Sequence, residues 1–446
     1  MKNYAISSFY LTAIVLILLF IIGHFNPIKV GAYTLKDVDI LQDIRADEEN
    51  NDIDSLPRPK VEPIYSARCQ PGMFCIEDYS PNKNALTRFL NALDSTNQKH
   101  IRIAFYGDSF IEGDIVTEDL REGLQDIYGG KGVGFVPTST VLAGYRKSVL
   151  IYSDELSSHW LVDSIVTRRE TGIAGSYYYP LEGASSIYIG SAFRRHIDTF
   201  STVRILYQNK HQSSIISYAI NRKEKGSVEL PKAPSIGIAE IKGGISRIWL
   251  GYPANSSLKL YGTLLDGDTG VCIDNFAMRG NSGFSMLDVP QETLQASDSL
   301  LNYRLIVLQY GLNAVHGNNK DFEAYKKRML KVIQHMKESF PNADILLLSV
   351  SDRSTLKSGK YVTMPGIPYM VNAQRELAAE AEIAFWDVYT AMGGENSMGE
   401  FVKSRPPKAA KDYTHLSFEG GRDIGNKLLE ALLYEKKKHD ERKNFY

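Results

Sequence analysis

The chain has 446 residues, of which 43% are hydrophobic and 23% are charged, and its formal net charge is −1. This is the composition of an ordinary globular protein, and the length allows about two to three domains. The balanced charge argues against nucleic acid as a partner, because a nucleic-acid-binding surface needs an excess of Lys and Arg.

The N-terminal end is the most hydrophobic part of the chain. Phe9 to Ile22 is almost entirely apolar, and the longer stretch from Ala5 to Gly23 approaches the length of a membrane-spanning helix. Lys2 is the only charged residue before it, which favours a cytoplasmic N-terminus. We therefore predict a membrane anchor at residues 1–25. A signal peptide cleaved near Gly31-Ala32 is the alternative, and both interpretations export the rest of the chain.

Residues 26–83 contain few apolar runs and include an acidic, Pro-containing segment at 46–63. This composition predicts a tether between the membrane and the folded part. Cys69 and Cys75 are close enough in the chain to form a small disulfide in an oxidising compartment. Cys272 lies in an apolar run and is interpreted as a buried thiol. Three cysteines and scattered histidines lack the closely spaced ligands of a zinc site, so no metal is expected.

The folded part is expected to begin with a strand and a helix, within residues 84–145. The run IRIAFYGDSF, from Ile101 to Phe110, is typical of a buried strand that ends in a turn. Leu120, Leu124 and Ile127 then fall on one face of a predicted helix. A strand followed by a helix is the first unit of a doubly wound parallel sheet.

The pattern changes between residues 146 and 269. Short runs rich in Tyr, Ile, Val and Ser are separated there by turn residues, a spacing that predicts a β-sandwich. The alternation of helix and strand returns in residues 270–446. The expected fold class is therefore α/β, with a doubly wound parallel-sheet domain split between 84–145 and 270–446. An all-β sandwich, of a jelly-roll or carbohydrate-binding type, interrupts it.

Four short segments carry polar or glycine residues at predicted strand ends or in loops. They are Gly107-Asp108-Ser109-Phe110, NFAMRG ending at Gly280, QYGLN ending at Asn313, and Asp412-Tyr-Thr-His415. In this order they resemble the serine, glycine, asparagine and histidine blocks of the SGNH (GDSL-type) hydrolase family. Two positions depart from the pattern, because Phe110 replaces the usual Leu or His and Ala314 replaces the usual acidic residue.

The resemblance implies a Ser-His-Asp triad. Ser109 would be the nucleophile, His415 the base that takes its proton, and Asp412 the carboxylate that orients the imidazole. The alternative for His415 is a histidine in a surface loop. Asp108, a second carboxylate beside the serine, is interpreted as a turn former.

The resemblance also implies three hydrogen-bond donors for the oxyanion that forms during ester hydrolysis. They are the Ser109 backbone N–H, the Gly280 N–H and the Asn313 side-chain amide. A glycine lets the backbone approach the substrate, and an asparagine donates without carrying charge. The alternatives are a glycine at a helix start and an asparagine in a turn. Gly283 replaces Gly280 if the register is shifted by one turn.

A sandwich between the first two blocks makes the chain similar to bacterial peptidoglycan O-acetylesterases, as do the segments GGKGVGFVP, WDVYTAMGG and PPKAAKDYTHLS. This similarity implies an exported serine esterase, without a cofactor, that removes O-acetyl groups from a cell-wall glycan such as peptidoglycan. The implied location is the bacterial periplasm, with the anchor in the inner membrane. One alternative is an O-acetyltransferase that uses the same triad together with a membrane acyl-donor protein. The other is a non-catalytic wall-binding scaffold.

The predicted sandwich is rich in aromatic residues. Trp160, Trp249 and the run Tyr177-Tyr178-Tyr179 could stack on sugar rings if they are exposed. The alternative is that they pack in the core and on the sheet, where aromatic residues are common.

Overall fold

The computed structural model describes residues 29–30, 33–34, 72–141, 144–161 and 168–443. The chain divides into two units, Met1–Lys60 and Val61–Tyr446. In the first, the described residues form one antiparallel pair, β1 (Lys29–Val30) and β2 (Tyr33–Thr34). The anchor predicted at residues 1–25 lies outside the described residues. Among the helices that the structure does describe, none is both long and apolar enough to cross a membrane.

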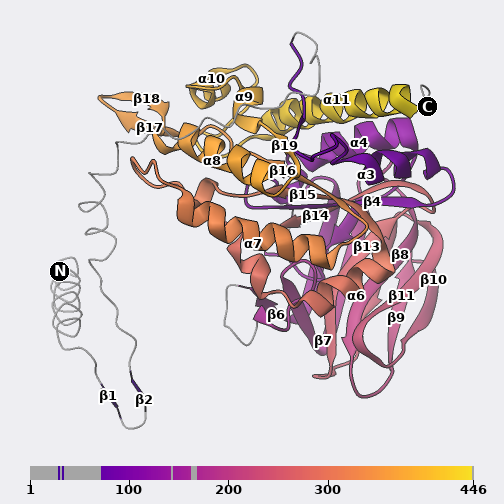
Figure 1. Cartoon of the computed structure of the whole chain (residues 1–446). Helices are drawn as coiled ribbons and strands as arrows, with labels where there is room; N and C mark the ends of the chain where they lie inside the picture. The colour runs from indigo at the N-terminus through magenta and orange to yellow at the C-terminus, as the bar shows by residue number, and fades with distance from the viewer. Residues whose placement is uncertain (1–28, 31–32, 35–71, 142–143, 162–167, 444–446) are drawn as a thin grey trace. The chain divides into compact units, whose positions relative to one another are not determined.

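The second unit contains a six-stranded sheet in the order β14-β4-β15-β16-β19-β3. Figure 1 labels all of these strands except β3. Its strands are β3 (Glu77–Asp78), β4 (His100–Gly107), β14 (Gly270–Ala277), β15 (Tyr303–Gln309), β16 (Asp344–Leu348) and β19 (Ala384–Trp386). All pairs are parallel except β19 with β3. This parallel sheet confirms the predicted α/β class.

Helices flank the parallel sheet. They are α3 (Thr87–Ala92), α4 (Thr117–Tyr128), α6 (Gln291–Leu301), α7 (Glu323–Ser339), α8 (Gly366–Glu380), α9 (Val388–Met392), α10 (Ser397–Lys403) and α11 (Phe418–Lys443). Short 3₁₀ turns are η1 (Leu93–Ser95), η2 (Glu112–Asp114), η3 (Phe284–Asp288) and η4 (Leu312–Ala314). A small antiparallel hairpin, β17 (Ser354–Lys357) with β18 (Lys360–Thr363), precedes α8.

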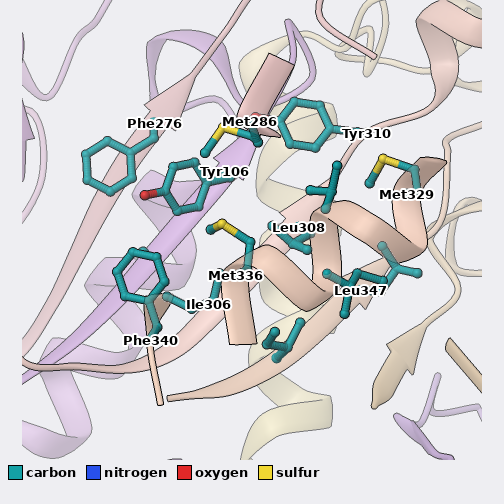
Figure 2. Close-up of a cluster of buried hydrophobic side chains, with 14 of the residues drawn as sticks. Tyr106, Phe276, Met286, Ile306, Leu308, Tyr310, Met329, Met336, Phe340 and Leu347 are labelled. Carbon is teal, nitrogen blue, oxygen red and sulfur yellow. The ribbon is translucent and has the colours of Figure 1, made fainter. Parts of the chain in front are cut away.

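Both faces of the parallel sheet are buried because helices pack on them, and alternate residues of each strand point to opposite sides. On β4, Phe105 belongs to the core that includes Leu120 and Leu124 of α4. Tyr106 belongs to the other core, shown in Figure 2, which includes Met329 of α7. Ile127, predicted for the same buried face as Leu120 and Leu124, is instead 53% exposed, because it lies in the last turn of α4, at the edge of this packing.

A separate antiparallel sheet of nine strands lies between β4 and β14 in the sequence. Its strands are β5 (Gly134–Val136), β6 (Val149–Trp160), β7 (Ser176–Gly190), β8 (Phe200–Asn209), β9 (Ser214–Ile220), β10 (Glu224–Leu230), β11 (Ala233–Ile245), β12 (Arg247–Gly251) and β13 (Leu258–Asp266). This confirms a separate all-β part. It starts with β5, before residue 146, and the boundaries predicted for its domain stay a prediction.

The two sheets share a core and buried charges. Tyr261 and Leu264 of β13 belong to the same hydrophobic cluster as Tyr106 of β4. Arg102 of β4 also forms an ion pair with Asp266 at the end of β13, and both side chains are almost fully buried. These contacts hold the antiparallel sheet against the parallel one, inside a single compact unit.

The cysteines fall into two classes. Cys75 is disulfide-bonded, and Cys69, its predicted partner, lies outside the described residues. Cys272 in β14 is a free thiol and is buried, as predicted.

Candidate active site

Three of the sequence-predicted site residues come together because of the strand order. β4 lies between β14 and β15, and all three strands run in the same direction, so their carboxyl ends lie at one edge of the sheet. Ser109 follows β4, Gly280 follows β14 and Asn313 lies in η4 just after β15. In open α/β sheets this edge is where ligands bind.

His415 and Asp412 reach this edge from the loop before α11. The His415 Nε2 atom is 3.2 Å from the Ser109 Oγ atom, and the His415 Nδ1 atom is 2.7 Å from Asp412 Oδ2. Because Asp412 accepts a hydrogen bond from Nδ1–H, Nε2 is left to accept one from the Ser109 hydroxyl. The structure therefore brings these three predicted residues into one hydrogen-bonded chain.

The loop from Asp412 to His415 is held by its own backbone and by the β17–β18 hairpin. The Asp412 Oδ1 atom accepts hydrogen bonds from the backbone N–H groups of Thr414 and His415, at 3.0 and 3.1 Å. Tyr413 has a φ of 56°. Its carbonyl accepts a hydrogen bond from the Ser354 N–H at 3.0 Å, and its ring stacks on Tyr361, with ring centroids 3.5 Å apart. The sequence analysis did not single out this hairpin.

The Asp412 carboxylate is poised to stay ionised. Partial burial acts to raise its pKa, but hydrogen bonds from the His415 side chain and from the backbone outweigh burial and lower the pKa below 3.8. The side chains of Asp412 and His415 are 51% and 41% exposed. The candidate site is therefore open to water on this side.

Asp108 has a role beyond that of a turn former. Its Oδ1 atom accepts the Phe110 N–H at 2.9 Å, which is the predicted turn contact. Its Oδ2 atom accepts the Asn313 amide at 2.7 Å, a contact that the sequence analysis missed. The Asp108 side chain is almost fully buried, and this burial raises its pKa to about 6, although the Phe110 N–H acts to lower it.

The three predicted oxyanion donors differ in their present partners. The Asn313 Nδ2 atom donates to Asp108 and also to the Asn281 carbonyl, at 3.1 Å. Within the described part of the chain, the backbone N–H groups of Ser109 and Gly280 donate no hydrogen bond. These two N–H groups are therefore available to an added ligand, whereas the Asn313 amide is already engaged.

Gly280 and Gly283, the two glycines considered for the second block, lie in different surroundings. Gly280 is exposed, has a φ of 71°, and has open space where a Cβ would be. Gly283 is buried and has a φ of 94°, and a Cβ there would meet Tyr310 and Met329 at about 3.0 Å. A substrate could therefore approach the backbone at Gly280, whereas Gly283 makes a tight packing contact.

The aromatic residues of the antiparallel sheet are also divided. Tyr177 and Tyr178 are buried, in agreement with the core interpretation. Trp249 is 36% exposed on β12, and Trp160 is partly buried at the end of β6.

Among the described residues, no group of three or more His, Cys, Asp or Glu side chains is placed to hold a metal ion.

Among the comparisons with known proteins, one solved structure supports the fold. No protein-family model and no curated protein matches the sequence. A solved structure of a peptidoglycan O-acetylesterase is similar, with a TM-score of 0.68 and 20% identity, over 81% of this chain and 99% of that one. An acetyl xylan esterase (TM-score 0.27, 21% identity, 36% and 80% of the two chains) and a family two carbohydrate esterase from Cellvibrio japonicus (0.27, 10%, 65% and 98%) are more distant.

The first of these similarities spans both the parallel sheet and the antiparallel sheet, because it covers most of this chain and nearly all of the other. The chain therefore has a fold similar to that of this solved peptidoglycan O-acetylesterase, in agreement with the fold that the four sequence blocks led us to expect.

Proposed function

We propose that the chain is a serine esterase that removes O-acetyl groups from a glycan. The observation that carries this proposal is the hydrogen-bonded chain from Ser109 through His415 to Asp412 at the carboxyl edge of the sheet. A serine hydroxyl is a weak nucleophile until a base takes its proton, and His415 Nε2 is within reach of that proton.

The acylation step follows from these contacts. The Ser109 Oγ attacks the acetyl carbonyl carbon while its proton passes to His415 Nε2. The carbonyl oxygen becomes an oxyanion, to which the N–H groups of Ser109 and Gly280 can donate. The Asn313 amide can join them by exchanging one of its present acceptors. The bond between the carbonyl carbon and the sugar oxygen then breaks, and His415 gives its proton to that oxygen.

Water completes the reaction. A water molecule attacks the acetyl-serine, and its proton passes to His415. The bond to Ser109 Oγ breaks and this oxygen takes the proton back, so acetate leaves and the free serine is restored. The ionised Asp412 stabilises the imidazolium that forms in both steps.

The substrate class is supported by the fold comparison, and the location is supported by the N-terminal sequence. The likeness to a peptidoglycan O-acetylesterase supports an acetylated cell-wall glycan as substrate. The apolar N-terminal stretch supports export, with residues 1–25 as an anchor, and a glycan of the cell envelope would be encountered there. We therefore extend the proposal to a bacterial envelope enzyme, periplasmic and anchored to the inner membrane, that acts on peptidoglycan.

One observation favours hydrolysis over acetyl transfer to a sugar. A transferase must keep water away from its acyl-enzyme, but the His415 and Asp412 side chains are 41% and 51% exposed. An open site lets water compete for the acetyl group. The transferase with a membrane acyl-donor protein is therefore the second candidate, and the scaffold is disfavoured because a binding protein needs no such chain of contacts.

The test uses the purified full-length protein and its Ser109→Ala variant. Both are incubated with O-acetylated peptidoglycan, and released acetate is measured. A parallel reaction contains de-acetylated peptidoglycan and p-nitrophenyl acetate as acetyl donor. Acetate release that depends on Ser109 supports the esterase. Transfer of acetyl to the glycan in preference to water would replace the esterase proposal by the transferase. If neither mixture shows a reaction that depends on Ser109, both proposals are wrong.

A further inference from the structure

A pocket lies beside the candidate site, at the junction of the parallel and antiparallel sheets. Its volume is about 310 Å³. From the α/β part it is lined by residues after β4 and β14, among them Glu112, Arg279 and Asn281. From the antiparallel part it is lined by Trp160 at the end of β6 and by Tyr145 in the segment before β6. Neither part forms the pocket alone.

The pocket lies next to the predicted oxyanion donors. Arg279 and Asn281 flank Gly280 in the chain, and the Asn281 carbonyl accepts the Asn313 amide at 3.1 Å. Glu112 and Gly113 follow the Ser109 turn. A group bound in the pocket is therefore next to an ester whose carbonyl lies against Ser109 and Gly280.

The pocket wall is mainly apolar and aromatic. The apolar lining residues include Phe135, Val149, Ile151, Leu161, Phe276 and Met278. The polar groups deep in the wall already have protein partners: the Asp114 carboxylate accepts hydrogen bonds from Arg121, Arg146 and Asn275. An occupant must therefore offer an apolar face to the wall.

The pocket rim has charged groups available for hydrogen bonding. The Arg279 guanidinium is 3.8 Å from the Glu112 carboxylate, and the Arg279 side chain is 62% exposed. A guanidinium carries five N–H donors, so one carboxylate at this distance leaves most of them for a ligand. Glu112 itself is half-buried, and this burial raises its pKa although Arg279 acts to lower it. Such a pocket, apolar inside with a few polar groups, is typical of small-molecule sites.

We propose that this pocket binds the sugar ring that carries the ester, with Trp160 as its stacking residue and Arg279 as its hydroxyl-binding residue. This assignment rests on the proposed esterase function and names the substrate part that the same site recognises. A pyranose ring has a C–H face that packs on an aromatic side chain and a hydroxyl edge that accepts N–H donors. It also gives the antiparallel sheet a role, because that sheet supplies Trp160.

The size of the pocket distinguishes the sugar from the acetyl group. A water molecule takes up roughly 30 Å³ in the liquid, so a methyl group of similar size would fill only a small part of the pocket. The remaining candidate is a long acyl chain, which would use the apolar wall but not the Arg279 donors or the Glu112 carboxylate. The test below separates these two occupants.

The experiment compares a glycan substrate with a substrate that has no sugar. For the full-length protein, kcat/KM is measured on O-acetylated peptidoglycan fragments and on p-nitrophenyl acetate. The readout is the value for the fragments divided by the value for p-nitrophenyl acetate. In Trp160→Ala this ratio should fall about tenfold, which corresponds to the loss of one good aromatic stacking contact. Trp249→Ala is the matched control, because Trp249 is an exposed tryptophan of the same sheet that is not part of the pocket wall. Its ratio should stay within about twofold of the unmodified protein.

Arg279→Ala is a second variant, and it should fold normally because the Arg279 side chain is largely exposed. It should also lower the ratio, by several-fold. An unchanged ratio in both Trp160→Ala and Arg279→Ala would overturn the sugar assignment, as would an equal fall in Trp249→Ala. A change in the preference between p-nitrophenyl acetate and p-nitrophenyl octanoate in Trp160→Ala, with the glycan ratio unchanged, would assign the pocket to an acyl chain. None of these outcomes depends on whether Ser109→Ala is inactive, which tests the esterase function by itself.

Discussion

The Asp108 carboxylate accepts a hydrogen bond from the Asn313 side-chain amide at 2.7 Å. This contact joins the turn after β4 to the turn after β15 and fixes the amide at the edge of the candidate site. Because the Asn281 carbonyl takes the second N–H of the same amide, Asn313 has both of its donors engaged. An oxyanion must therefore compete with one of these two acceptors for the Asn313 amide. Because Asp108 is one of them, its ionisation state affects that competition.

Asp108→Asn should flatten the pH dependence of stability. The pKa of Asp108 is raised from 3.8 to about 6 by burial, so between these pH values the folded protein holds a proton that the unfolded chain has released. The folded state is then penalised as pH rises, and the unfolding free energy falls by up to about 3 kcal/mol through this one group. An asparagine cannot ionise and should lack this fall.

The measurement is urea unfolding at pH 4 and pH 7 for both proteins. Between pH 4 and pH 7 the unfolding free energy of the unmodified protein should fall more than that of the variant. The variant loses an acceptor oxygen at every pH, so only the change between the two pH values is diagnostic. Equal changes in the two proteins would show that Asp108 has an ordinary pKa.

Ser109→Ala should lower turnover of p-nitrophenyl acetate by roughly 10³-fold or more, because the nucleophile is lost. The side-chain hydrogen bond that the structure gives Ser109 is a partly buried contact with His415, outside the hydrophobic cores, so the fold should be kept. Circular dichroism and thermal unfolding check the fold, and the rate on the aryl ester checks the chemistry. A folded variant with near-normal activity would remove Ser109 from the mechanism.

Asn313→Ala should lower kcat by roughly 10²–10³-fold, the usual effect of removing one oxyanion donor, and should change KM far less. The reason is that a hydrogen bond to the oxyanion strengthens as charge develops in the transition state. Steady-state kinetics on p-nitrophenyl acetate separate the two constants. A variant with a raised KM and a normal kcat would make Asn313 a substrate-binding residue instead.

Asp412→Asn should lower kcat by up to roughly 10⁴-fold with little change in KM, because the amide no longer favours the His415 tautomer that accepts the Ser109 proton. The Nδ1–Oδ2 distance of 2.7 Å motivates this prediction. Asp154→Asn, an exposed aspartate of β6, serves as the control and should leave the kinetics unchanged. If both variants keep full activity, the imidazole is oriented by another group.

Tyr361→Ala should lower kcat/KM about fivefold, since loss of the stacking on Tyr413 loosens the loop that carries Asp412 and His415. Tyr361→Phe keeps the ring and should restore the rate. Tyr369, which is similarly exposed at 45%, provides the control variant Tyr369→Ala. A phenylalanine variant as slow as the alanine variant would mean that stacking is not the cause.

The sequence by itself determined which residue types stand at the ends of the strands, and therefore most of the candidate site. Ser109, Gly280 and Asn313 each follow an apolar strand, and parallel strands bring their carboxyl ends to one edge whatever lies between them. Asp412 and His415 are close in the chain, so a local loop can pair them. The spacing of apolar residues along a strand or helix is also a local property, and for this reason the sequence predicted both sheets.

Only the tertiary structure decided the contacts between residues far apart in the sequence. Asp108 meets Asn313 across 205 positions, and Trp160 shares a pocket with Arg279, although neither pairing leaves a repeating pattern in the chain. Tyr361 reaches Tyr413 in the same way, through a hairpin whose docking depends on the whole core. Such contacts arise from packing two sheets and their loops together, and the local patterns of the sequence do not encode which side chains will then touch.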